Sequence, residues 1–138
     1  MTMLTPVLAL AVWTLIIWLW MYATRIPAMQ KAKVHPQSAL HAGALDSLPT
    51  NARVVADNYN HLHEQPTIFY ALAIYSHMVG VGDPLNIWLA WGYVALRVAH
   101  SFAQIILQKV MVRFYIFSAS TILLMIIAVR NVIALLAV

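Results

Sequence analysis

Hydrophobic residues gather in four stretches along this chain, separated by polar segments. The stretches cover residues 4–24, 66–81, 85–107 and 114–136. A helix needs about 20 mainly apolar residues to cross the hydrocarbon core of a bilayer, so each stretch is predicted to span a membrane. The second stretch is short, and we expect the amphipathic segment from Pro49 to Gln65 to extend the same helix into water. The pattern therefore predicts an all-α bundle of four transmembrane helices in a single domain.

Local signals indicate where the second helix begins and how it turns into the third. Asp46 or Ser47 is the predicted N-cap, and Pro49 is tolerated in the first turn. The sequence Gly-Val-Gly-Asp-Pro at residues 80–84 leaves few residues for the reversal of the chain. Spans two and three are therefore predicted to form a tight antiparallel hairpin. The polar segment from Lys31 to Leu48 is long enough to be a functional loop or lid.

Polar side chains interrupt the third apolar stretch at helical intervals, within an arc of about 80°. They are Tyr93, Arg97, His100, Gln104 and Gln108. The apolar residues outside this arc are Leu96, Phe102, Ile105 and Ile106. A polar side chain at membrane depth is costly unless it faces the protein interior or a wet cavity. We therefore expect this face to point away from lipid, either as part of a buried site or as a polar packing seam.

A second polar line precedes the second apolar stretch. It consists of Arg53, Asp57, His61 and Glu64, with Asn58 and Gln65 beside it. Arg53 and Asp57 have the i,i+4 spacing of a helical ion pair. Glu64 is the only glutamate in the chain and lies one turn inside the predicted cytoplasmic boundary. We therefore expect an ion pair between Glu64 and either Arg97 or Arg113, because burial of an uncompensated carboxylate is unfavourable.

Composition supports a membrane protein. Hydrophobic residues make up 63% of the 138 residues and charged residues 9%, whereas a soluble domain carries about 25% charged residues. A membrane protein can leave its exterior apolar, so the net charge of +4 is better explained by topology than by binding to nucleic acid. Cysteine is absent, which excludes disulfides, thiolate metal sites and a cysteine nucleophile. Any thiol must come from a bound ligand.

Basic residues indicate how the chain crosses the membrane. Arg25, Lys31, Lys33 and Arg53 lie between spans one and two, and Lys109 and Arg113 lie between spans three and four. Because basic loops stay on the cytoplasmic side, both termini are predicted to lie outside the cytoplasm of a multi-pass protein of the cell (inner) membrane. The apolar start lacks a basic region and a cleavage motif, so it is predicted to be a retained first span.

The histidines do not predict a metal site. His61 and His63 would point about 200° apart on a helix, and no third ligand has a diagnostic spacing. His77 and His100 lie on different spans, which leaves a haem held between two helices as a weaker alternative.

The second and third spans carry motifs that resemble the MAPEG family, the membrane-associated proteins in eicosanoid and glutathione metabolism. One motif is Asn-Tyr-Asn-His-Leu-His-Glu-Gln-Pro at residues 58–66, and the other is Ala-Leu-Arg-Val-Ala-His at residues 95–100. An arginine, Arg113, follows at the start of span four. The resemblance covers nearly the whole chain. Departures from the eicosanoid enzymes at Asp57, His61 and Gln104 bring it closer to an uncharacterised bacterial branch.

The resemblance implies a homotrimer of four-helix subunits that binds glutathione between neighbouring subunits, near the cytoplasmic face. By motif position it implies that Arg113 is the catalytic residue, which stabilises the thiolate of the ligand. It further implies that Arg25, Glu64, Arg97 and His100 bind the ligand. Polar residues near these positions complete the predicted ligand-binding set, and they are Arg53, Asn58, His61 and Gln104.

The predicted function is that of a membrane enzyme or binder that uses glutathione or a similar thiol. Its expected substrate is a lipophilic electrophile or hydroperoxide that arrives from the surrounding membrane lipids, as for a glutathione transferase or peroxidase. One alternative is a non-catalytic membrane protein whose polar residues serve trimer assembly or lipid binding. Another is a small proton or solute carrier built around Glu64 and His100.

Overall fold

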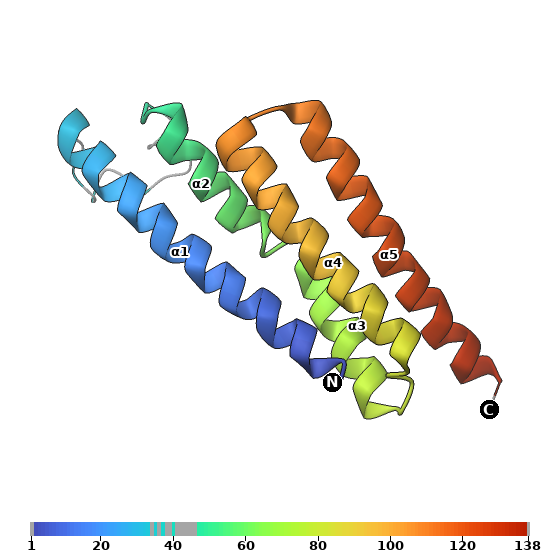
Figure 1. The fold of residues 1–138 in the computed structure, drawn as a ribbon. Coiled ribbons are helices and arrows are strands. Elements are labelled where there is room, and N and C mark those ends of the chain that lie inside the picture. Colours follow the sequence, from blue (N-terminus) through green and yellow to red (C-terminus); the bar gives the residue numbers. More distant parts are fainter. Residues whose placement is uncertain (1, 34, 36, 38–39, 41–46, 138) are drawn as a thin grey trace.

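The computed structural model describes residues 2–33, 35, 37, 40 and 47–137 of the chain. Its helices are α1 (Leu4–Ala32), α2 (Thr50–His61), α3 (Pro66–Met78), α4 (Pro84–Phe102), the π-helix η2 (Ala103–Leu107) and α5 (Val110–Leu136). They form four rods that alternate in direction, with α2 and α3 in one rod and α4 and η2 in another (Figure 1). Both ends of the chain lie at the same end of the bundle (Figure 1). The predicted all-α, four-rod architecture is confirmed.

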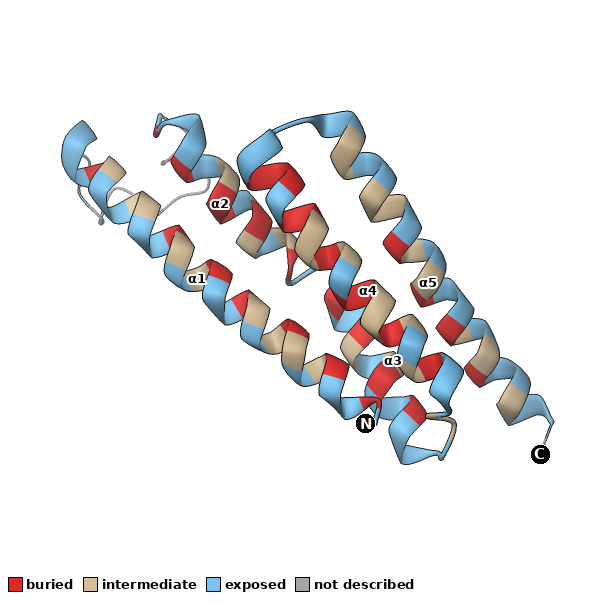
Figure 2. Cartoon of the chain, in the orientation of Figure 1, coloured by how far each residue is buried: buried red, intermediate tan, exposed pale blue. Residues whose placement is uncertain are grey.

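Two of the four rods meet the criteria for a membrane span by themselves. Helices α1 and α5 are long enough and apolar enough to cross a bilayer. Exposed residues run along both helices (Figure 2), and many of them are large and apolar, such as Leu8, Leu15 and Val129. Helix α3 has only 13 residues, and α4 buries Asn86, Arg97 and His100. Helix α3 is therefore too short to cross a bilayer by itself, and α4 differs from α1 and α5 because it carries buried polar side chains.

The prediction of one continuous helix from the aqueous phase into span two is wrong. Helix α2 ends at His61, and residues 62–65 form turns before α3 begins at Pro66. Pro66 has no N–H to donate, and within a helix its ring would clash with the carbonyl group of Leu62. The amide of Glu64 bonds instead to the carbonyl oxygen of His61, three residues back, at 3.2 Å. Pro66 therefore opens a new helix.

The start of α2 also differs from the prediction. Its N-cap is Pro49 rather than Ser47, and no side chain caps the helix. The other predicted cap, Asp46, lies outside the described residues, as does much of the predicted loop or lid at residues 31–48. Helix α1, which precedes this loop, continues to Ala32 and therefore extends beyond residue 24, the predicted end of span one.

The predicted hairpin between spans two and three is confirmed. The chain reverses between α3 and α4 within residues 79–83, where Gly80 has a φ of 79° that favours glycine. The carboxylate of Asp83 then caps α4 by accepting a hydrogen bond from the amide of Asn86 at 2.9 Å. Pro84 follows as the first residue of α4, where its missing N–H costs nothing.

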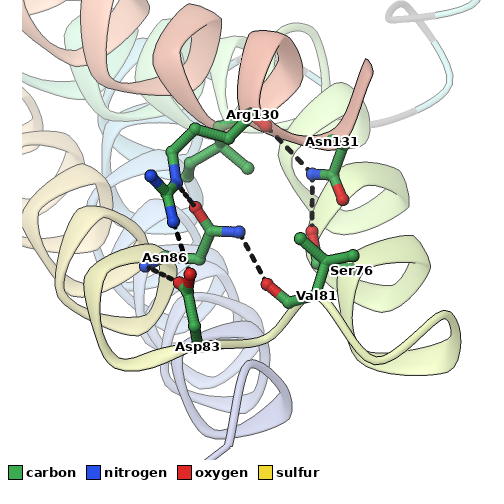
Figure 3. A network of polar contacts seen from close by, with 7 residues as sticks. Ser76, Val81, Asp83, Asn86, Arg130 and Asn131 are labelled. Atoms are coloured by element: carbon green, nitrogen blue, oxygen red, sulfur yellow. Dashed lines mark hydrogen bonds and ion pairs between the residues drawn. The ribbon is translucent and has the colours of Figure 1, made fainter. Parts of the chain in front are cut away.

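A polar network links α5 to this hairpin (Figure 3), at the end of the bundle where both termini lie (Figure 1). Arg130 forms an ion pair with Asp83, and its Nε–H donates to Oδ1 of Asn86 at 2.7 Å. One residue further along α5, Nδ2 of Asn131 donates to Oγ of Ser76 at 2.7 Å. Sequence analysis did not relate these positions, because they are far apart in the chain and come together only when the rods pack.

We expect the replacement of Arg130 by methionine to destabilise the protein more than Asp83→Asn does. Asn86 is fully buried, so loss of the Arg130 donor leaves its Oδ1 unsatisfied, at a cost of about 1 to 3 kcal/mol. Asp83→Asn mainly weakens a partly exposed ion pair, worth about 0 to 1 kcal/mol. Thermal melting of the two detergent-purified variants measures the difference, and equal melting temperatures would contradict this account.

Candidate functional site

Four side-chain hydrogen bonds join α2 and the turn after it to α4, to η2 and to Gln108, the residue that follows η2. The pairs are Asn51 with Gln108 at 3.4 Å, Asn58 with Gln104 at 2.9 Å, His61 with Arg97 at 2.9 Å, and Gln65 with Tyr93 at 3.1 Å. We call this set the polar ladder. It confirms that the polar face of the third predicted span points into the protein interior, since Tyr93, Arg97, His100 and Gln104 are buried and Gln108 alone of the five is exposed.

The π-helix η2 sets the register of the ladder near the loop before α5. The amide of Gln108 donates to the carbonyl oxygen of Ala103, five residues back, at 2.8 Å. This wider turn buries Gln104 against Asn58. It also buries Ile105, which was predicted to lie outside the polar face, while Ile106 remains exposed. A π-turn of this kind is rare and often occurs at functional sites, but neither glycine nor proline marks it in the sequence.

The most unusual group in the ladder is the guanidinium of Arg97, which is 0% exposed. Its Nη2 donates to Nδ1 of His61, and the ring of Phe117 lies 5.8 Å from its Cζ atom. Its Nε and Nη1 atoms are buried and have no hydrogen-bond partner among the described residues. A buried cation without a counter-charge is costly. Among the described residues, no acceptor reaches these two nitrogens of Arg97.

The predicted ion pair of Glu64 with Arg97 or Arg113 does not form within the described part of the subunit. The Glu64 side chain is exposed, and it has neither an ion-pair nor a hydrogen-bond partner there. The turns at residues 62–65 break the helical phase, so that Gln65 rather than Glu64 faces α4. The expected pair between Arg53 and Asp57 is likewise not found among the described residues.

The rings of His61 and His100 lie side by side, and His61 is the hydrogen-bond partner of Arg97. The ring centroids of His61 and His100 are 4.8 Å apart, and Phe117 packs against both rings. Because the guanidinium can only donate, Nδ1 of His61 is the acceptor, which requires its unprotonated form. Burial and the positive charges of Arg97 and Arg113 lower the pKa of His61, although Glu64 offsets part of this effect. His61 is therefore neutral at pH 7.

We expect acid to destabilise the protein through His61. A histidine with a lowered pKa in the folded state contributes stability that is complete above its unfolded pKa of about 6.5 and is lost as the pH falls through the folded value. The melting temperature should therefore fall less steeply below about pH 6.5 in His61→Gln than in the parent. His77→Gln, at an exposed histidine, is the control. An unchanged slope in His61→Gln would contradict the assignment.

Two cavities open beside the ladder. The end cavity, of about 200 Å³, lies between α2 and the start of α5, and its lining includes Asp57, Gln104, Lys109 and Arg113. The histidine cavity, of about 190 Å³, is lined by His61, His100, Val110, Arg113, Phe114 and Phe117. Arg113 and Val110 line both cavities. The half-buried Arg113 side chain therefore lies at their junction.

The structure brings together most of the predicted site residues, but not all of them. Those in the ladder or the two cavities are Asn58, His61, Arg97, His100, Gln104 and Arg113. Three others line neither cavity, namely Arg25 on α1, Arg53 on α2 and the exposed Glu64. Sequence analysis missed Phe117 as a member of the site, because an aromatic residue in an apolar helix carries no signal of its own.

The structure does not support a haem between His77 and His100. His77 lies in the last turn of α3 and His100 in the last turn of α4, and these turns are at opposite ends of the antiparallel hairpin. Among the described residues, no group of three or more histidine, cysteine, aspartate or glutamate side chains is placed to hold a metal ion.

The four rods, the apolar exposed surfaces of α1 and α5 and the buried polar site between the helices are the features of a helical membrane protein. The chain matches the MAPEG family over residues 3–133, and it therefore belongs to that family. Membership implies a membrane protein related in general to glutathione-dependent transferases and peroxidases. Neither the curated proteins nor the solved structures gave a match.

Proposed function

We propose that this protein binds glutathione or a similar thiol in the end and histidine cavities and uses it on lipophilic electrophiles or hydroperoxides. The observation that carries the proposal is the guanidinium of Arg97, which is buried with two nitrogens that have no acceptor. Arg97 itself lines neither cavity, but its partner His61 lines the histidine cavity. A ligand carboxylate that entered past the His61 ring would satisfy the Arg97 donors with charge-assisted hydrogen bonds, which are among the stronger ones in proteins.

The other groups at the site fit a small thiol peptide. Arg113, at the junction of the cavities, would lower the pKa of a thiol beside it, and only the thiolate attacks an electrophile. The Nδ1 atom of His100, which lines the histidine cavity, is buried without a partner among the described residues, so it is available to a peptide group. Phe114 and Phe117 provide an apolar wall for a lipophilic substrate.

The proposal includes a homotrimer with the ligand at a subunit interface near the cytoplasmic face. Arg25, Arg53 and Glu64 lie outside the two cavities of their own subunit, so they would reach the ligand from a neighbouring one. The exposed apolar residues of α1 and α5 leave surface for both lipid and partner subunits. In this arrangement the two chain termini, which share one end of the bundle, lie outside the cytoplasm.

Calorimetry of the detergent-purified protein tests the proposal directly. We expect glutathione to bind and to show the ultraviolet absorbance of a thiolate at neutral pH, because Arg113 favours the ionised thiol. S-methylglutathione is the matched control: it keeps the charges of the peptide but has no ionisable thiol. It should bind without that absorbance. Failure of glutathione to bind at millimolar concentration would exclude the proposed function.

The exposed Glu64 favours one alternative of a different class, in which the polar residues serve assembly alone. In that case the counter-charge for Arg97 is a carboxylate of another subunit, and no thiol is needed. Native mass spectrometry separates the two functions. Loss of the trimer in Glu64→Gln together with an absence of glutathione binding in the parent would support the assembly role.

A further inference from the structure

The end cavity carries charges of both signs. Asp57 lines it from α2, whereas Lys109 and Arg113 line it from the loop before α5 and from α5 itself. Asp57 forms no ion pair with either cation within 4.0 Å, and none with any other described residue. The cavity therefore presents a carboxylate separately from two cations, and its other polar groups are the neutral side chains of Thr50, Gln104 and Gln108.

Asp57 also has a defined place relative to the proposed thiol site. It precedes His61 by four residues, so the two side chains lie on the same face of α2, about 6 Å apart along the helix axis. His61 lines the histidine cavity, and Arg113 lies between that cavity and Asp57. A ligand with its thiol at Arg113 therefore has the Asp57 carboxylate within reach, on the side away from Phe117.

We propose that Asp57 binds an ammonium group of the ligand, while Lys109 and Arg113 face its anionic groups. The inference rests on the proposed function and narrows its substrate class to thiol peptides that carry a free amino group, as the γ-glutamyl residue of glutathione does. A carboxylate in place of that ammonium would meet the negative charge of Asp57 and be repelled. The pocket thus selects a zwitterionic thiol over a purely anionic one.

The test compares two peptides that differ only in the amino group. Glutathione and glutaryl-cysteinylglycine, its analogue without the amine, are titrated into the parent protein and into Asp57→Asn. We expect the parent to bind glutathione about tenfold more tightly than the analogue, as one charged hydrogen bond allows. In Asp57→Asn this preference should disappear through weaker glutathione binding. Asp83→Asn, which removes a carboxylate at the opposite end of the bundle, should keep the preference.

A third peptide distinguishes this inference from the proposed function. γ-Glutamyl-alanylglycine has the ammonium but no thiol. If it binds the parent and weakens in Asp57→Asn, while bound glutathione gives no thiolate absorbance, the ammonium site stands and the thiol function fails. A different result is possible, in which glutathione binds as a thiolate and Asp57→Asn changes the affinities for glutathione and for glutaryl-cysteinylglycine equally. In that case the ammonium site is overturned and the function stands. Binding by none of the three peptides overturns both.

Discussion

Replacement of Arg97 by methionine is expected to abolish glutathione binding without unfolding the protein. The loss of a buried charged partner typically costs a complex about 2 to 5 kcal/mol, which is enough to remove a weak ligand. The free protein should be at least as stable as the parent, since methionine removes two buried nitrogens that have no acceptor within the described residues. Replacement of buried ionic groups by apolar ones is often neutral or stabilising, by about 1 to 4 kcal/mol.

Calorimetry with glutathione and thermal melting of the same preparations measure the two effects. Lys31→Met is the matched control, since it removes a positive charge at the exposed end of α1 and leaves the cavities unchanged. Glutathione binding by Arg97→Met with the affinity of the parent would show that the ligand does not use the buried guanidinium. A strong loss of stability instead would mean that Arg97 already has an anionic partner in the assembled protein.

The second large effect is expected at Arg113. Arg113→Ala should bind glutathione but lose thiol-transfer activity, because the side chain stabilises a thiolate rather than the helix bundle. Removal of one group that stabilises a developing anion typically lowers turnover by a factor of roughly 100 to 1000. The pH at which the bound thiol ionises should rise in the same variant, and its ultraviolet absorbance reports that pH.

Arg113→Lys provides the matched comparison for this prediction. Lysine keeps the positive charge at the junction of the two cavities, so it should restore part of the activity and part of the shift in thiol ionisation. A purely structural role would instead give both variants the same loss of melting temperature. Full turnover in Arg113→Ala would exclude the catalytic assignment and favour the assembly role.

The polar face of span three could be predicted from sequence because its period is that of a helix and its residues are too polar for lipid. The partners of that face could not be predicted in the same way. The helical phase of α2 ends at His61, because the turns before Pro66 interrupt the helix, and the π-turn at residues 103–107 adds a residue to the facing rod. Each feature shifts the side chains beyond it, which explains the errors at Glu64 and Ile105.

The hairpin between α3 and α4 makes one pair of the ladder predictable. In a tight antiparallel hairpin, residues at equal distances from the turn face one another, and Asn58 and Gln104 follow this rule. Gln65 and Tyr93 depart from it by about one helical turn. The cavities were beyond the reach of the sequence, since they depend on how α5 packs beside α2 and η2. The sequence predicted Asp57 as the ion-pair partner of Arg53. Its proposed role in ligand binding was suggested only by its place in the lining of the end cavity.

The polar ladder has a consequence for the way the chain enters the bilayer during synthesis. Helices α1 and α5 can partition into lipid individually because they are long and apolar. Helix α4 contains Tyr93 and Arg97. Their hydrogen-bond partners, Gln65 and His61, lie in the segment that is synthesised just before α4. Pairing across a short turn requires little loss of chain entropy. We therefore expect the second and third rods to leave the translocation machinery together, as one hydrogen-bonded hairpin.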